Sequence, residues 1–239
     1  IATLGKDLFV TDFVGSFVLL SGCFLAAFGF LWFYQQTELT EETKQFNTRP
    51  LANIIKQPVF IVAISSATIG YVVMSYLMTA TPMSMHVIDG FSLEQTKFVI
   101  QSHVIAMFLP SLFTPLVVKW IGLGKMMLTG ILIYFACVAL AYSGHALNNY
   151  WLALILLGLG WNFLFIGGTS LLPRAYKENE KFKVQSLNDF LIFTVQALAS
   201  LSAGWFVFNY GWEMVLISVV PLLIIQLMVL LYWVKFSHT

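Results

Sequence analysis

Charged residues are scarce in this sequence. Only 10% of its 239 residues are charged, whereas about a quarter are charged in ordinary soluble domains. Hydrophobic residues make up 59% of the chain, so a domain of this composition could not cover itself with a water-facing surface. The composition therefore excludes an ordinary soluble protein.

Cysteine is almost absent as well. Cys23 and Cys137 are the only two, and both fall within hydrophobic runs, where we expect them to pack as small apolar residues rather than to form a bridge. The chain begins at Ile1 and shows neither an initiator methionine nor a charged segment with a cleavage site that would indicate a signal peptide. We therefore expect that it begins within a longer protein or was trimmed.

Long hydrophobic runs are what the sequence does contain. A transmembrane helix needs about 20 mainly apolar residues, and seven such runs follow one another, separated by polar or turn-rich breaks. Nearly the whole chain is therefore expected to lie in a membrane, as an all-α polytopic protein. The predicted spans are Leu8–Tyr34, Val59–Thr81, Phe98–Val118, Met126–Tyr142, Tyr150–Leu172, Val184–Phe208 and Trp212–Trp233.

The basic residues predict an orientation. If the breaks alternate across the bilayer, ten Lys and Arg residues lie on one side and two on the other. By the positive-inside rule the richer side is cytoplasmic, which places the N-terminus of this segment outside and the C-terminus inside. The ten are Lys44, Arg49, Lys56, Lys119, Lys125, Arg174, Lys177, Lys181, Lys183 and Lys235, and the two are Lys6 and Lys97.

One break is much longer than the others. The stretch from Gln35 to Pro58 separates the first hydrophobic run from the other six. Long connections are commonly linkers or functional loops, so we interpret this one as a cytoplasmic linker, with an ordinary inside loop as the alternative. The predicted organisation is a transmembrane helix in residues 1–34, the linker in 35–58 and a six-helix bundle in 59–239.

Polar residues divide the predicted helices into two kinds. The runs 8–34, 126–142 and 212–233 are almost uniformly apolar, whereas the other four carry stripes in which residues three, four, seven or eleven apart share a helix face. From Val59 onward the order is striped, striped, apolar, striped, striped, apolar, which is a period of three helices. The stripes are Thr68, Tyr71, Ser75 and Thr79; His103, Ala106, Pro110 and Thr114; Gly158, Asn162, Phe165 and Thr169; and Asp189, Phe193, Gln196 and Ser200.

This period resembles the major facilitator superfamily (MFS), in which each six-helix half consists of two inverted three-helix repeats. The turn PLVVKWIGLGKMM keeps Gly122 and Lys125 of the superfamily's signature between the second and third helices of a half, although it has no acidic residue. The segments WNFLFIGGT and VQSLNDF are similar to uncharacterised bacterial members.

The resemblance is to the second half of a twelve-helix member. It implies that residues 8–34 correspond to the superfamily's sixth span, residues 35–58 to its central linker and the six later runs to spans seven to twelve. It also implies that the striped helices line the central cavity or contact the other half, and that the membrane is a bacterial inner membrane.

The polar side chains within the spans are the candidate site residues. For the substrate cavity they are Thr68, Tyr71, Ser75, His103, Asn162 and Gln196. For ion coupling or an inside gate they are Asp189, His103 and Asn188. An ionisable residue at the centre of a span costs about 2.5–3.5 kcal/mol, so its presence there suggests a function.

Each of these residues also has a structural interpretation. Asp189 could take up a proton or pair with a basic residue of the other half, or its charge could be stabilised by the start of its helix and by Lys181 or Lys183. His103 could relay protons, or it could bond to a neighbouring helix. Asn162 could line the cavity or join two helices.

The leading functional hypothesis is a secondary transporter that moves a small organic solute by alternating access, driven by an ion or proton gradient, since the sequence contains no Walker-type nucleotide loop. The alternatives are a heptahelical receptor and a non-transporting scaffold subunit. An enzyme is not expected, because His86, His103, His145 and His238 are scattered without an HExxH pair. The expected partners are the solute, a coupling ion such as H⁺, the lipid bilayer and an N-terminal six-helix half on the same or another chain, with no nucleic acid, cofactor or metal.

Overall fold

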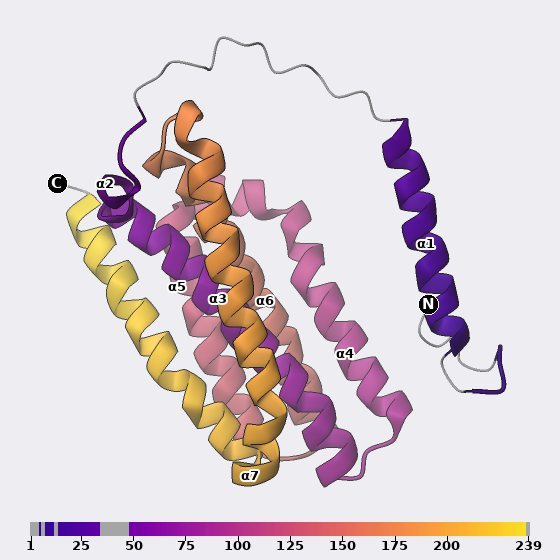
Figure 1. Ribbon diagram of the computed structural model, residues 1–239. Helices are drawn as coiled ribbons and strands as arrows, with labels where there is room; N and C mark the ends of the chain where they lie inside the picture. Colours follow the sequence, from indigo (N-terminus) through magenta and orange to yellow (C-terminus); the bar gives the residue numbers. More distant parts are fainter. Residues whose placement is uncertain (1–4, 6–7, 12–13, 34–47, 238–239) are drawn as a thin grey trace. The chain divides into compact units, whose positions relative to one another are not determined.

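The structure is a computed structural model that describes residues 5, 8–11, 14–33 and 48–237 (Figure 1). The chain divides into two compact units, residues 1–46 and 47–239. The first unit contains helix α1 (Val14–Trp32), which is almost wholly apolar. Most of the predicted linker, residues 35–47, lies outside the described residues.

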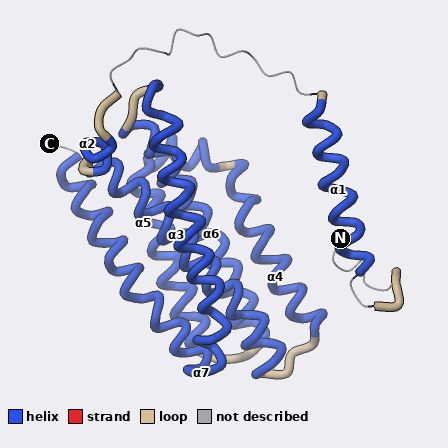
Figure 2. Tube along the Cα trace, in the orientation of Figure 1, coloured by secondary structure: helices blue, strands red, loops and turns tan. Residues whose placement is uncertain are grey.

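The second unit is a helical bundle, and the described residues contain no strand (Figure 2). The predicted all-α membrane fold is confirmed. The elements are α2 (Leu51–Ile55), α3 (Pro58–Pro82), the π-helical η2 (Met83–Ile88), α4 (Leu93–Phe108), the 3-10 helix η3 (Leu109–Leu112), α5 (Thr114–Tyr142), α6 (Leu147–Leu171), the 3-10 helices η4 (Leu172–Ala175) and η5 (Glu178–Glu180), and α7 (Lys181–Ser237).

Two glycines reverse the chain within these elements. Gly122 in α5 has φ 78° and ψ 162°, and Gly211 in α7 has φ 82° and ψ 170°. Positive φ of this kind strains residues that carry a Cβ atom, which is why glycine stands at both turns. At Gly211 the chain doubles back, so α7 has a first arm (181–210) and a second arm (212–237) (Figure 1).

Five segments of the described chain are long and apolar enough to cross a membrane: 14–32, 58–88, 114–142, 147–175 and 178–235. At 1.5 Å per residue the first arm of α7 is about 45 Å long and the second about 40 Å, and both exceed the bilayer's hydrocarbon core of about 30 Å. The remaining predicted span, Phe98–Val118, is made of α4, η3 and the first turns of α5. Helix α4 has 16 residues and is by itself shorter than the about 20 residues that cross a membrane.

Helix α6 packs against α3, α4 and α5, and α3 also packs against α7. The approach to α3 is close because Gly168 has no side chain. A Cβ atom at Gly168 would lie 2.6 Å from the carbonyl oxygen of Ala63 and 2.8 Å from the amide nitrogen of Ala67. A second contact of this kind holds α4, where a Cβ atom at Gly158 would lie 2.8 Å from the carbonyl oxygen of His103. Small residues at helix crossings are typical of membrane bundles, where close packing provides much of the association energy.

Candidate functional site

The striped face of α3 presents Thr68, Tyr71 and Ser75. Thr68 and Tyr71 are half-buried, whereas Ser75 is buried. The Tyr71 ring lies near the middle of α3 and contacts the rings of Trp161 and Phe165 on α6, with centroids 5.5 and 5.2 Å away. Tyr71 of the predicted face therefore meets α6, whereas Thr68 lines a hollow with Leu191 and Val195 of the first arm of α7.

Asn162 is fully buried between α6 and the end of α4. Its Nδ2 donates to the carbonyl oxygen of Met107 and to Ser111 Oγ, both at 2.7 Å. Pro110 lacks an amide hydrogen and interrupts α4 at this depth, where η3 begins. A broken helix within a membrane needs new partners for its backbone groups, and Asn162 supplies one. Its contacts are those of a residue that joins two helices, and its role in the cavity stays a prediction.

His103 is also fully buried. Its Nδ1 lies 2.8 Å from the carbonyl oxygen of Leu154, so the ring bridges α4 and α6. Its Nε2 has no hydrogen-bond partner among the described residues. The structure therefore gives His103 the inter-helix hydrogen bond that the structural interpretation expects.

The first arm of α7 carries Asn188, Asp189 and Gln196. Asp189 is exposed beside a shallow, mainly apolar hollow that Phe193 also lines. Asn188 is buried, and its Nδ2 donates to Asp189 Oδ1 at 3.0 Å. Gln196 is half-buried, further from the arm's start. Asp189 is thus an accessible carboxylate within a predicted span. Phe193, nearer the middle of the same arm, lies one helical turn away.

One end of the bundle, which we call the basic end, contains residues 48–57 and the turn between α6 and α7. Arg49 donates to Glu180 from its main-chain nitrogen at 3.1 Å, from Nε at 2.8 Å and from Nη2 at 2.6 Å. Glu180 is 1% exposed and also accepts from the amide of Lys177 at 2.9 Å. Gln57 Nε2 adds a bond to the carbonyl oxygen of Ala175 at 2.9 Å. These bonds attach the segment before α3 to the turn before α7.

The opposite end is joined by a cluster around His145, in the turn between α5 and α6. His145 Nδ1 lies 2.8 Å from Asp89 Oδ2, and its Nε2 lies 2.8 Å from Glu213 Oε1. Tyr150 also donates to Asp89 Oδ2 at 2.7 Å, and its hydroxyl lies 2.7 Å from Ser84 Oγ. The cluster thus connects η2, the α5–α6 turn, α6 and the second arm of α7.

The sequence analysis missed both end clusters. Their members are 131 residues apart in the Arg49–Glu180 pair and 68 apart in the His145–Glu213 pair. Two features of the sequence could have indicated them. Glu180 is an acid within a Lys-rich turn, and alternation of the spans places the turns that contain His145 and Asp89 on the same side of the membrane.

We expect the His145 cluster to make stability depend on pH. Glu213 and, after it, Asp89 raise the pKa of His145 above its usual value near 6.5, because only the protonated ring can donate from both nitrogens. The cluster therefore stabilises the fold fully below about pH 6.5, and this contribution is lost as the pH rises through the folded-state pKa. Thermal unfolding in detergent at pH 6 to 9 measures it.

The matched variants are His145→Gln and His86→Gln. The first is expected to remove this part of the pH dependence, whereas the second, on an exposed His with a main-chain partner, keeps it. An unchanged pH profile in His145→Gln would contradict the assignment.

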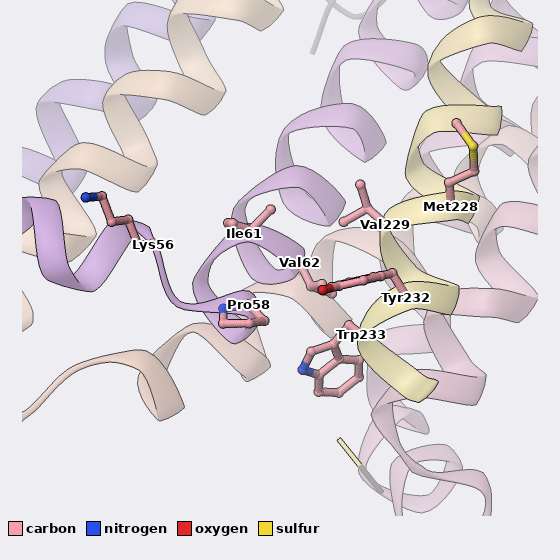
Figure 3. A pocket seen from close by; sticks show the side chains of 8 residues that line it. All are labelled: Lys56, Pro58, Ile61, Val62, Met228, Val229, Tyr232 and Trp233. Carbon is pink, nitrogen blue, oxygen red and sulfur yellow. The ribbon is translucent and has the colours of Figure 1, made fainter. Parts of the chain in front are cut away.

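A separate hollow of about 500 Å³ lies at the basic end, between the start of α3 and the end of α7 (Figure 3). Ile61 and Val62 of α3 line one side, and Val229 and Tyr232 of α7 line the other. Tyr71 lies ten residues beyond Ile61 on α3, or about 15 Å along the helix. The hollow is therefore distinct from the region near the middle of α3 where Tyr71 contacts Trp161 and Phe165.

Comparison with known proteins finds relatives that are all named as transporters. The riboflavin transporter RfnT of Brucella anthropi is 33% identical over 225 residues, which are 93% of this chain and 56% of RfnT. The uncharacterized MFS-type transporter YddS of Bacillus subtilis is 32% identical over 162 residues, which are 66% of this chain and 37% of YddS. The MFS-type transporter YdeG of the same organism, also uncharacterized, is 36% identical over 138 residues, or 57% of this chain and 32% of YdeG.

The chain is homologous to transporters of the major facilitator superfamily. It matches only about half of the length of RfnT and about a third of each B. subtilis protein, a coverage that fits a half-domain. No family model matches the chain. No solved structure matches it either.

Within the superfamily resemblance, the structure adds how the striped helices meet. Side chains of α3, α4, α6 and the first arm of α7 come together at mid-depth through aromatic rings, and polar bonds fix α6 to the break in α4. The apolar second arm of α7 nevertheless has a buried polar residue. Gln226 Nε2 donates to Ser66 Oγ on α3 at 2.7 Å.

Proposed function

We propose that the protein is a secondary transporter that moves a small organic solute across the membrane by alternating access, driven by an ion or proton gradient. The observation that carries the proposal is the similarity to RfnT over 93% of this chain. The convergence of four helices at mid-depth supports it, since transporter sites commonly lie near the bilayer midplane between helix bundles.

The proposed arrangement is the second half of a twelve-helix transporter, with α1 as its sixth span, residues 35–58 as the cytoplasmic linker and residues 59–239 as the six-helix bundle. The basic end would face the cytoplasm, in a bacterial inner membrane, because Lys and Arg concentrate there. The other six-helix half would cover the exposed face of the first arm of α7.

The proposed division of labour follows the geometry. Thr68, Tyr71 and Gln196, which are half-buried, would face the solute, with Ser75 further along the same face. Asn162 and His103 would hold α4 against α6 and so fix the shape of the cavity. Asp189, steadied by Asn188, is the proposed proton acceptor, because it is an accessible carboxylate in a span.

Uptake into proteoliposomes under an imposed pH gradient tests the function. RfnT is named a riboflavin transporter, so riboflavin is the first solute of the panel. We expect gradient-driven uptake by the wild-type protein and a fall of about tenfold in Asp189→Asn, because an amide cannot take up and release the proton. Exchange of preloaded solute, which needs no net proton movement, is expected to persist in Asp189→Asn.

The control is Glu178→Gln, which changes an exposed acid in the turn at the basic end. It is expected to transport like the wild type. Uptake that responds to no imposed gradient for any solute of the panel would count against the proposal.

A further inference from the structure

Five aromatic rings from four helices meet near the middle of the bundle. They are Tyr71 of α3, Phe108 at the end of α4, Trp161 and Phe165 of α6, and Phe193 of the first arm of α7, and we refer to them as the aromatic cluster. Tyr71 contacts Trp161, Phe165 and Phe193 edge to face, with centroids 5.5, 5.2 and 6.0 Å apart. Trp161 stacks on Phe165 at 5.0 Å and meets Phe108 at 5.8 Å.

The aromatic cluster is not buried evenly, as a packed core would be. Trp161 is 4% exposed and lies behind, whereas Phe193 is 54% exposed and Phe108 is 58% exposed in the described chain. Tyr71 and Phe165 are half-buried between them. The cluster therefore leaves the rings of Phe193 and Phe108 open and encloses the indole of Trp161.

Polar atoms at the cluster lack partners. Thr68 Oγ1, Trp161 Nε1 and Asn162 Oδ1 are buried and form no hydrogen bond with the described residues. A buried polar atom without a partner is costly, and most costly within a membrane. Trp161 belongs to the cluster, Asn162 follows it in α6 and Thr68 lies three residues before Tyr71 in α3, so the unpaired polar groups nearest the rings are few and uncharged.

The same inventory excludes other ligand classes. A polyol brings several hydroxyls, and the cluster has too few polar atoms to satisfy them. No basic residue is among the aromatic and polar residues named, and the hollow that Phe193 lines carries only the carboxylate of Asp189, so an anionic group would be held without a counter-charge. Aromatic faces at these spacings favour another flat π-system, because offset and edge-to-face contacts add to the burial of apolar area.

We propose that the aromatic cluster binds a neutral, planar aromatic ring, held by Tyr71, Phe165 and Phe193. The ring would belong to the transported solute, so this assignment rests on the transport function proposed above. It adds the chemical class of the solute and the side chains that select it.

Binding of lumichrome, a planar three-ring heteroaromatic compound, to the purified full-length protein tests the assignment. Titration in nanodiscs, followed by fluorescence, is expected to show saturable binding that ribitol, a flexible polyol, does not compete for. Phe193→Ala and Phe165→Ala are each expected to weaken lumichrome binding about tenfold, the usual effect of losing one stacking partner. Phe193→Trp keeps a flat ring and is expected to retain the affinity within about twofold.

The matched control is Phe208→Ala, an exposed phenylalanine on the same arm that belongs neither to the cluster nor to the hollow beside Asp189. It is expected to bind lumichrome like the wild type. Binding that does not saturate, or that is equally tight in the wild type, Phe193→Ala and Phe165→Ala, would overturn the assignment.

Failure of the ring site and failure of transport are separable. Phe193-dependent lumichrome binding without gradient-driven uptake of any solute would contradict transport and leave the ring site standing. Gradient-driven uptake of solutes that lack a ring, unchanged in Phe193→Ala, would overturn the ring site and leave transport standing.

Discussion

Gly168→Ala is expected to lower the thermal unfolding temperature by roughly 5 °C, because the new methyl group would meet the backbone of α3. The nearest atoms are the Ala63 carbonyl oxygen at 2.6 Å and the Ala67 amide nitrogen at 2.8 Å, neither of which can rotate away. Helices α3 and α6 would have to separate, and overpacking of this kind costs about 1–3 kcal/mol. Thermal unfolding of the purified protein in detergent measures the change.

Gly204→Ala is the matched control for this effect. It is the same substitution on the first arm of α7, but the nearest atoms are the end of the Met83 side chain at 3.2 Å. A methionine side chain can change rotamer, so the unfolding temperature is expected to stay within about 2 °C of the wild type. Equal losses in Gly168→Ala and Gly204→Ala would mean that the approach of α3 to α6 has no special importance.

Glu180→Ala is expected to raise hydrogen exchange in residues 48–57 by roughly tenfold. Glu180 accepts three bonds from Arg49 and one from the amide of Lys177, so its loss leaves the segment before α3 without its main attachment to the α6–α7 turn. Hydrogen–deuterium exchange with mass spectrometry measures it directly, because the amides of Arg49 and Lys177 are themselves donors to this carboxylate.

The Arg49–Glu180 pair can be separated from general effects of charge. Arg49→Ala is expected to raise exchange as much as Glu180→Ala, and the double variant no further, since residues that act as a pair are not additive. Glu178→Ala, in the same turn, removes an exposed acid whose contact with Lys181 is 3.5 Å long, and exchange is expected not to change. Faster exchange in Glu178→Ala, or none in Glu180→Ala, would contradict the role given to the pair.

Taken together, these contacts make residues 48–237 a body held at three levels. The Arg49–Glu180 pair ties the basic end, the His145 cluster ties the opposite end, and the glycine contacts of α6 close the middle. A body held in this way would suit the proposed alternating access, in which each half moves as one piece. Its exposed aromatic side is where the proposed solute and the proposed second half would meet.

The sequence predicts the structural surroundings of some candidate residues but not of others. The stripe Thr68, Tyr71 and Ser75 marks one side of α3, because helical spacing fixes which side chains share a face. The stripes do not reveal that Asn162 donates a hydrogen bond to Met107, beside the break at Pro110, or that His103 bonds to the carbonyl oxygen of Leu154. Those partners are more than 50 residues away along the chain, and spacing within one helix says nothing about them.

The sequence by itself determined the class of fold and the placement of its helices, because runs of about 20 apolar residues with few charges are stable only as membrane helices whose backbone groups pair within the segment. It also determined which helices are polar on one face. Only the tertiary structure decided which side chains meet: Glu180 with Arg49, His145 with Asp89 and Glu213, and the five rings of the aromatic cluster. The physical reason is that these contacts depend on how closely whole helices approach one another, which is set by small residues and breaks on several helices at once.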